Sequence, residues 1–400
     1  MAEQHDTIVI GAGQAGLAMS HYLSEVGREH VVLERATVAD RWRSQRWDSL
    51  MFQFPNWSLE LPGKKYDGPA PDAFSHKDAV RTFIEEYARR IRAPVKTGVE
   101  VLSLSEEMNG YALATGAADY RAKHVVIATG PYQRARIPPI AVGLPDGIAQ
   151  VHAGDYRNPA QLPPGAVLVI GSGGSGCQIA EELLAARRKV FLAIGRHRRV
   201  PRHYRGHDGF WWRRELGMLD TTVDQAPVER RQPPLFTGIG GGHTVSIRSY
   251  AKEGMTLLGH VQEIRDGKLF LADDLTRNLA AGDRSYDDFT AAVDRRIEDH
   301  GRDDPEEALF DERTTQPVHR ETLGLREEGI GTVIWATGYV HDFRWVRLPI
   351  FDERGLPVQR RGATPARGIY FIGLSWLHKA KSAFLGGVGE DAQHIAESLE

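Results

Sequence analysis

The sequence predicts an α/β fold in which one strand–helix–strand unit is inserted into another, and three observations support this prediction. An apolar strand, the glycine-rich turn GAGQAG at 11–16, an amphipathic helix and a second strand at 31–34 open the chain. The same order returns around GSGGSG at 171–176. The phrase ATG closes an apolar strand at 128–130 and another at 336–338. We therefore expect a first domain at 1–160 that resumes at 331–400, and a second at 161–330 with an insert at 200–325.

The composition is that of a globular chain of two or three domains. Its 400 residues include 50 Lys and Arg and 53 Asp and Glu, a formal net charge of −3, which gives no reason to expect a nucleic-acid partner. No run approaches the ~18 apolar residues of a membrane span, and the N-terminus shows no signal segment. We expect a cytoplasmic protein that binds neither nucleic acid nor membrane.

The first glycine motif has the spacing of a dinucleotide-binding turn. Gly11 would allow the tight turn, Gly13 close approach of the backbone to a pyrophosphate, and Gly16 contact between helix and strand. Glu34 ends the next strand, where a carboxylate accepts hydrogen bonds from ribose hydroxyls. The alternative is a purely structural glycine turn, but the strand before the motif and the helix after it favour nucleotide binding.

The second motif differs at the position that contacts the ribose. Counting onward from GSGGSG to the equivalent of Glu34 reaches Ile194, and Arg196 and Arg198 follow. A carboxylate there would repel a 2′-phosphate, whereas guanidinium groups pair with it, so this fold is expected to prefer NADPH over NADH. The alternative is a solvated basic loop.

Two nucleotide folds in one chain are explained if one cofactor reduces the other, and a flavin is the usual electron partner of a nicotinamide. This layout resembles the two-dinucleotide-binding-domain flavoproteins. The resemblance implies two Rossmann-like dinucleotide-binding domains, the NADP domain inserted into the FAD domain, with FAD and NADPH as cofactors. Disulfide reductases of this group need a cysteine pair beside the flavin, whereas Cys177 is the single cysteine here.

The resemblance is strongest to the flavin-containing and plant auxin-pathway monooxygenases, and it covers nearly the whole chain. The segment RWRSQRWDSLMFQFPNW at 41–57 looks like the part that covers the flavin in that family, with Trp42 at the family's tryptophan. Asn56 lies near the family's asparagine that contacts flavin and nicotinamide, and it is the expected catalytic residue. The alternative for Asn56, between Pro55 and Trp57, is a plain turn residue.

The other expected cofactor contacts follow from the same motifs and resemblance. In the FAD-binding parts they are Gly11, Gly13, Gln14, Ala15, Gly16, Glu34, Arg35, Trp42, Val101, Thr129, Gly130 and Gly387. In the NADPH-binding part and at the second ATG phrase they are Ser172, Gly173, Gly174, Ser175, Gly176, Arg196, Arg198, Thr337 and Gly338. Gly387 belongs to a glycine cluster that would open the terminal helix with bare amide groups.

The family's fingerprint, F-x-G-x-x-x-H-x-x-x-Y, is only half present. His152 and Tyr156 fit its second half, but Asp146 stands where the phenylalanine belongs and Ile148 where the glycine belongs. This departure weakens the assignment within the family. It does not affect the predicted architecture of two nucleotide-binding folds. We expect His152 to be either a hinge residue satisfied by the backbone or a residue that positions NADPH.

Residues 200–325 are the hardest part of the sequence to interpret. Phe210, Trp211 and Trp212 either pack in a core or form the wall of a substrate pocket. GIGGGHT at 238–244 forms either a surface loop or an anion nest, and a helix is expected near 288–299. Elsewhere, Ser75 and Asp78 predict a capping box for a scaffold helix. The histidines lack metal-site spacing, so no metal is expected.

The resemblance implies an FAD-dependent, NADPH-consuming monooxygenase. One oxygen atom of O2 would pass through a flavin C4a-hydroperoxide to a small organic substrate, in a pocket that excludes water. An alternative enzyme is an NADPH-dependent flavin reductase that passes electrons to a quinone or protein acceptor without oxygenation. A third hypothesis is a non-catalytic protein that senses nucleotides. A homodimer is possible.

Overall fold

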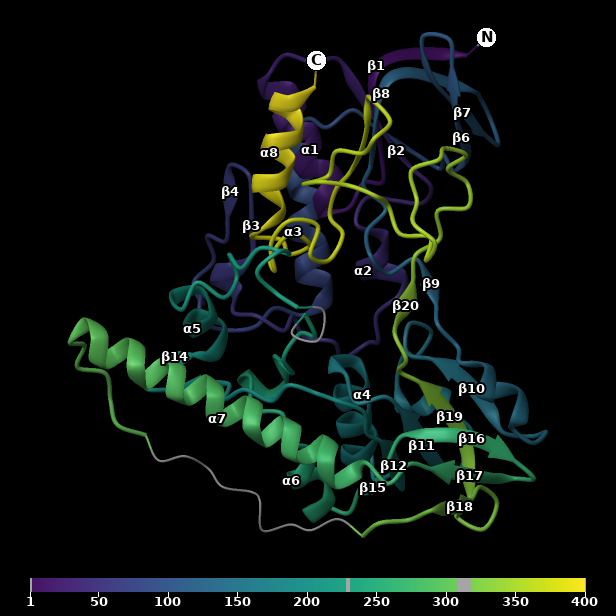
Figure 1. The fold of residues 1–400 in the computed structure, drawn as a ribbon, viewed down its shortest axis with the longest axis vertical. Coiled ribbons are helices and arrows are strands. Elements are labelled where there is room, and N and C mark those ends of the chain that lie inside the picture. Colours follow the sequence, from purple (N-terminus) through teal and green to yellow (C-terminus); the bar gives the residue numbers. More distant parts are fainter. Residues whose placement is uncertain (1, 228–230, 308–317, 400) are drawn as a thin grey trace.

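The computed structural model describes residues 2–227, 231–307 and 318–399 and shows an α/β fold built on two large sheets (Figure 1). The chain leaves the first sheet after β8, forms the second sheet, and returns to the first with β21. The predicted fold class, with one nucleotide fold inserted into the other, is therefore confirmed. The domain boundaries at 160 and 330 stay predictions.

The first sheet has the order β5–β2–β1–β8–β7–β6, and β21 pairs with the end of β8. Its strands are β1 (Glu3–Ile10), β2 (His30–Glu34), β5 (Val95–Thr97), β6 (Val101–Glu107), β7 (Gly110–Thr115), β8 (Tyr120–Ile127) and β21 (Ile369–Phe371). The central pairs β1–β2 and β1–β8 are parallel, and β6, β7 and β8 form an antiparallel meander. The central segments of these parallel strands, residues 8–10, 31–33 and 125–127, are continuous apolar runs because both faces of this part are buried.

Three helices pack beside the first sheet. α1 (Gln14–Glu25) lies against α8 (Val388–Ser398), as Figure 1 shows, and also contacts α3 (Lys77–Arg90). The short elements α2 (Asp40–Ser44), β3 (Glu60–Leu61) and β4 (Lys64–Lys65) lie in the connection that leads to α3. α3 is not capped as predicted: His76 is its N-cap and accepts a hydrogen bond from the Asp78 amide. The Ser75 hydroxyl instead donates to Asn56, 2.7 Å away.

The second sheet is fully parallel, with the order β10–β19–β11–β12–β15. Its strands are β10 (Ala149–His152), β11 (Ala166–Ile170), β12 (Val190–Ala193), β15 (Thr256–Leu258) and β19 (Ile330–Trp335), and α4 (Gly174–Ala185) joins β11 to β12. The two folds are linked by β9 (Arg134–Ala135) and β20 (Tyr339–Val340), which pair antiparallel where the chain crosses in each direction. The two ATG phrases thus lie at the two crossings.

Residues 200–325 add structure to the second fold and between the folds. The elements are β13 (His203–Tyr204), β14 (His207–Asp208), α5 (Gly209–Glu215), α6 (Ile247–Lys252), β16 (Val261–Arg265), β17 (Lys268–Leu271), α7 (Leu275–His300) and β18 (Thr322–Gly324). α7 has 26 residues and begins well before the expected 288. A Cβ added at its Gly282 would lie 2.3 Å from Nε2 of His197, so the glycine permits this close packing. Among the described residues, no helix is both long and apolar enough to cross a membrane.

Candidate active site

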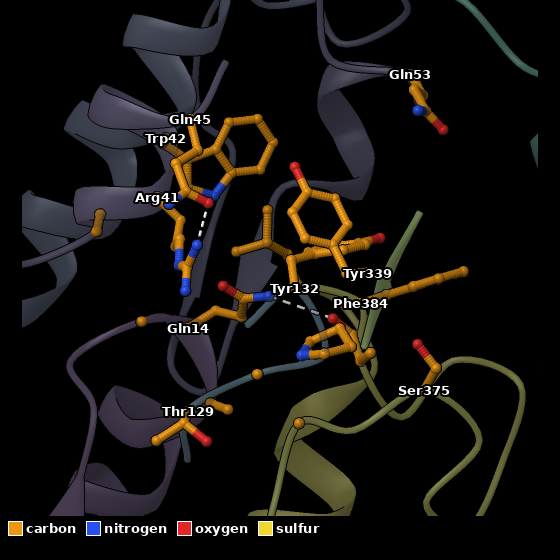
Figure 2. A pocket seen from close by; sticks show the side chains of 18 of the residues that line it. Gln14, Arg41, Trp42, Gln45, Gln53, Thr129, Tyr132, Tyr339, Ser375 and Phe384 are labelled. Atoms are coloured by element: carbon orange, nitrogen blue, oxygen red, sulfur yellow. Dashed lines mark hydrogen bonds between the residues drawn. The ribbon is translucent and has the colours of Figure 1, made fainter. Parts of the chain in front are cut away.

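A cavity of about 840 Å³ lies between the two nucleotide folds. Both the start of α1 and the start of α4 line it, together with the end of β2, the end of β8, α5 and the segment that precedes α8. Figure 2 shows Trp42, Tyr132, Tyr339 and Phe384 around this space. Ligand pockets commonly measure roughly 300–1,000 Å³, so the cavity is large enough for a ligand.

The first glycine turn leaves the start of α1 open to the cavity. Gly11 has φ +108°, and a Cβ at Gly16 would lie 1.8 Å from the Gly11 carbonyl oxygen, so both positions require glycine. A Cβ at Gly13 would meet nothing within 4 Å. Gly13 is also the N-cap of α1, and no side chain caps this end. The bare amide groups at a helix start, with open space before them, suit a phosphate group.

The second glycine turn repeats this geometry. Gly171 has φ +111°, a Cβ at Gly176 would lie 1.8 Å from the Gly171 carbonyl oxygen, and a Cβ at Gly173 would meet nothing within 4 Å. The N-cap of α4 is Gly173, again without a side-chain cap. Gln53, from the first fold, reaches this turn: its Nε2 is 3.5 Å from the place of a Gly174 Cβ. Both helix starts therefore offer the same anion cradle to one cavity.

The strand register explains the difference between the two ribose positions. Ile10 pairs with Leu33 and Ile170 with Ala193, so Ile194 occupies in the second fold the place that Glu34 has in the first. The Glu34 carboxylate accepts hydrogen bonds from the amides of Ala12 (2.8 Å) and Ala36 (2.9 Å), and it lines the cavity. These bonds fix the carboxylate, and its outward lone pairs can still accept from a ribose.

About half of the sequence-predicted residues line the cavity. They are Gly11, Gly13, Gln14, Ala15, Glu34, Arg35, Trp42, Val101, Thr129, Gly130, Gly174, Ser175 and Arg198. Those that do not line it are Gly16, Asn56, Ser172, Gly173, Gly176, Arg196, Thr337, Gly338 and Gly387. Three glycines in the second group, Gly16, Gly176 and Gly387, permit close backbone packing: a Cβ at Gly387 would lie 2.1 Å from the Lys381 carbonyl oxygen. Arg196 is exposed, so of the two predicted arginines only Arg198 faces the cavity.

Asn56 is buried but turns away from the cavity. Its Nδ2 donates to the Ala70 carbonyl oxygen at 2.9 Å, and its Oδ1 accepts from the Ser75 hydroxyl. Its backbone amide donates to Ala73. The side chain thus holds the 70–75 loop in place, and this geometry gives no support to the predicted catalytic contact with flavin and nicotinamide.

We predict that Asn56→Ala destabilises the fold without slowing the chemistry. The change removes three hydrogen bonds of the side chain, to Tyr66, Ala70 and Ser75, and leaves the Ala70 carbonyl and the Ser75 hydroxyl without this partner, which costs about 2 kcal/mol of unfolding free energy. Urea denaturation of the flavin-loaded protein measures this loss, and rapid mixing with NADPH should give a flavin reduction rate within twofold of wild type. A large fall in that rate at unchanged stability would restore the catalytic interpretation.

The two fingerprint residues, His152 and Tyr156, also form hydrogen bonds with other residues of this chain. His152 Nε2 lies 3.0 Å from the Gly338 carbonyl oxygen, and its Nδ1 accepts from the Gly154 amide. The Tyr156 hydroxyl donates to Glu182, 2.6 Å away. His152 thereby ties β10 to the second crossing, as expected of a hinge residue, and neither side chain lines the cavity.

Sequence reasoning missed several cavity residues. Tyr132 and Tyr339 follow the two ATG phrases, and their rings meet edge to face with centroids 5.3 Å apart. This repeated tyrosine was the signal that could have identified them. Arg41 also lines the cavity; burial lowers its pKa, and the charges of Arg35 and Arg46 lower it further. Arg213, on α5, directly follows Trp211 and Trp212, and this aromatic run was the signal that could have identified it.

Gln14 connects the two ends of the first fold at the cavity. Its Nε2 donates to the Ala383 carbonyl oxygen at 3.2 Å, the contact drawn as a dashed line in Figure 2. Phe384, the next residue, also lines the cavity. The segment that precedes α8 is thus placed directly beside the glycine turn of α1.

Known proteins resemble this chain over part or all of its length. A family model for pyridine nucleotide-disulphide oxidoreductases matches residues 8–206. An uncharacterized CzcO-like oxidoreductase of Geobacillus kaustophilus is 33% identical over 98% of this chain and 98% of its own. The probable indole-3-pyruvate monooxygenase YUCCA1 of Arabidopsis thaliana is 28% identical over 48% of this chain and 47% of its own. A flavin-containing monooxygenase from Stenotrophomonas maltophilia shares the fold, with a TM-score of 0.69 at 19% identity over 99% of this chain and 98% of that one. These matches confirm the resemblance indicated by the motifs.

Proposed function

The chain belongs to the family of the CzcO-like oxidoreductases, and we propose that it is a flavin-dependent monooxygenase that consumes NADPH and transfers one oxygen atom from O2 to a small organic substrate. FAD and NADPH are its two cofactors. The observation that carries the proposal is the pair of open glycine turns that face one cavity, one beside Glu34 and the other beside Arg198. Two dinucleotides held around one space are placed for electron transfer between them.

The residues of this chain would bind and orient the cofactors. The amides at the start of α1 would hold the FAD pyrophosphate, and Glu34 would accept from its ribose. The amides at the start of α4 would hold the NADPH pyrophosphate. When bound, FAD would accept two electrons from NADPH and react with dioxygen, through the C4a-hydroperoxide that the family resemblance implies.

Aromatic side chains would exclude water from the reacting centre. Phe54 and Phe210 stack with ring centroids 4.0 Å apart, and Phe384 lies 5.4 Å from Phe54. All three line the cavity. A dry wall of this kind protects a reactive oxygen species from decay to hydrogen peroxide.

Anaerobic reduction followed by exposure to air tests the proposal. We expect NADPH to bleach the yellow protein within seconds, and we expect label from ¹⁸O2 to appear in an organic product once a substrate is supplied. Rapid bleaching followed by immediate return of the oxidised spectrum, with peroxide formed in amounts equal to the NADPH consumed, would instead favour a flavin reductase. No bleaching would leave only a nucleotide-binding role. The expected homodimer stays a separate prediction.

A further inference from the structure

α5 presents one face to the cavity and the other to the core. Phe210, Arg213 and Arg214 line the cavity, because residues at i, i+3 and i+4 share a helix face. Trp212 points the opposite way and is fully buried, and its indole N–H donates to the Tyr204 carbonyl oxygen at 2.7 Å. The aromatic residues of this segment therefore divide between both predicted roles, since Phe210 lines the pocket and Trp212 packs in the core.

The guanidinium of Arg213 lacks a partner. Within the described residues it has no hydrogen bond and no ion pair, and no carboxylate affects its pKa. Burial, and after it the charge of Arg198, lower this pKa to about 10, so Arg213 is still protonated at neutral pH. A half-buried cation without a counter-ion is costly to the fold.

Several other arginines in or near the cavity have partners. Arg202 is buried and forms a bidentate pair with Asp208, with N–O distances of 2.7 and 2.8 Å, and Arg231 donates to two backbone carbonyl oxygens. Arg214 lies over the Trp57 ring, 5.2 Å from its centroid. Arg35 and Arg134 also line the cavity without a side-chain partner among the described residues, but both are exposed to solvent. Arg213 differs from them because it is half-buried.

Arg213 and Arg198 both line the cavity at the junction of the two folds, near enough for the charge of Arg198 to lower the pKa of Arg213. Arg198 follows β12 of the second fold, and its Nη1 contacts the Gln232 carbonyl oxygen at 3.4 Å. Arg213 is one turn beyond Phe210, which packs against Phe54 of the first fold. Both guanidinium groups line the cavity, so positive charge gathers between the folds beside an aromatic wall.

We propose that Arg213 and Arg198 together bind an anionic group, a carboxylate or a phosphate, of a ligand that enters this cavity. Planar guanidinium groups bind such oxyanions in bidentate geometry, and Phe54, Trp57 and Phe210 would contact the organic part of the ligand. The site rests on the proposed function, whose ligands supply two sources of the anion: an acidic substrate and a phosphate of NADPH.

Equilibrium titrations of the FAD-loaded protein test the site without turnover. The probes are benzoate against its neutral analogue benzamide, and NADP⁺ against NAD⁺, at low ionic strength, read by calorimetry and by the flavin spectrum. The variants are Arg213→Gln, Arg213→Lys and Arg198→Gln. The control is Arg326→Gln, which removes the same charge at an exposed turn.

We expect Arg213→Gln to weaken benzoate or NADP⁺ binding at least tenfold, benzamide affinity to stay within twofold, and Arg213→Lys to recover most of the loss. A loss for benzoate alone identifies a substrate acid as the source; a loss for NADP⁺, alone or together with NAD⁺, identifies a cofactor phosphate. Unchanged affinities for all charged probes, or an equal loss for benzoate and benzamide, would overturn the proposal. If Arg213→Gln does not fold, Arg198→Gln decides in its place, and unchanged affinities of that variant for benzoate, NADP⁺ and NAD⁺ overturn the proposal. These titrations measure binding and not turnover. Absence of NADPH oxidation would therefore contradict the proposed function and leave the proposed anion site standing.

Discussion

Gly13→Val is expected to yield a folded but colourless protein. The backbone at Gly13 has φ −84° and ψ −173°, which valine adopts without strain, and an added Cβ meets no protein atom within 4 Å. The side chain would instead enter the space before the start of α1, where the FAD pyrophosphate is proposed to bind. We expect FAD affinity to fall about 100-fold, or roughly 2.8 kcal/mol. The flavin content of the purified protein and titration of the apoprotein with FAD measure this effect.

A matched control separates loss of cofactor from loss of fold. Gly116 lies in the turn between β7 and β8, an added Cβ there also meets nothing within 4 Å, and the residue does not line the cavity. Gly116→Val should therefore purify yellow with normal FAD content. If Gly13→Val also bound FAD normally, the pyrophosphate would not lie at this turn. Gly16→Val is unsuitable for this test, because its Cβ would overlap the Gly11 carbonyl and damage the fold itself.

The parts of the site that the sequence predicts are those set by local geometry. A glycine turn between a strand and a helix contains its own conformational requirements, so Gly11, Gly16, Gly171 and Gly176 could be assigned roles before the structure was seen. Counting residues from each turn to the end of the next strand also worked, because parallel pairing aligns Glu34 with Ile194.

The parts that could not be predicted depend on contacts between distant segments. Asn56 is near a family position in the sequence, but its orientation is decided by the 70–75 loop, which takes both ends of its amide. Arg196 and Arg198 are equivalent in a sequence count, and only the three-dimensional path after β12 turns Arg198 inward. Arg213 joins Arg198 because α5 packs on Phe54, a contact between residues 156 positions apart in the chain.

Gly173→Val is expected to keep FAD and lose its reduction by NADPH. Gly173 has φ −73° and ψ 179°, a Cβ there meets no protein atom within 4 Å, and the start of α4 is the proposed NADPH pyrophosphate site. The side chain would fill that site while the first glycine turn stays intact. We expect the Kd for NADPH to rise about 100-fold, or roughly 2.8 kcal/mol, measured as the NADPH dependence of anaerobic flavin reduction. Dithionite should still bleach the protein fully, since it needs no nucleotide site.

Together with Gly13→Val, this variant separates the roles of the two glycine turns. Gly13→Val lacks the flavin, whereas Gly173→Val holds a flavin that NADPH reduces only at high concentration. If Gly173→Val were reduced at wild-type NADPH concentrations, the assignment of the two cofactors to the two folds would be wrong.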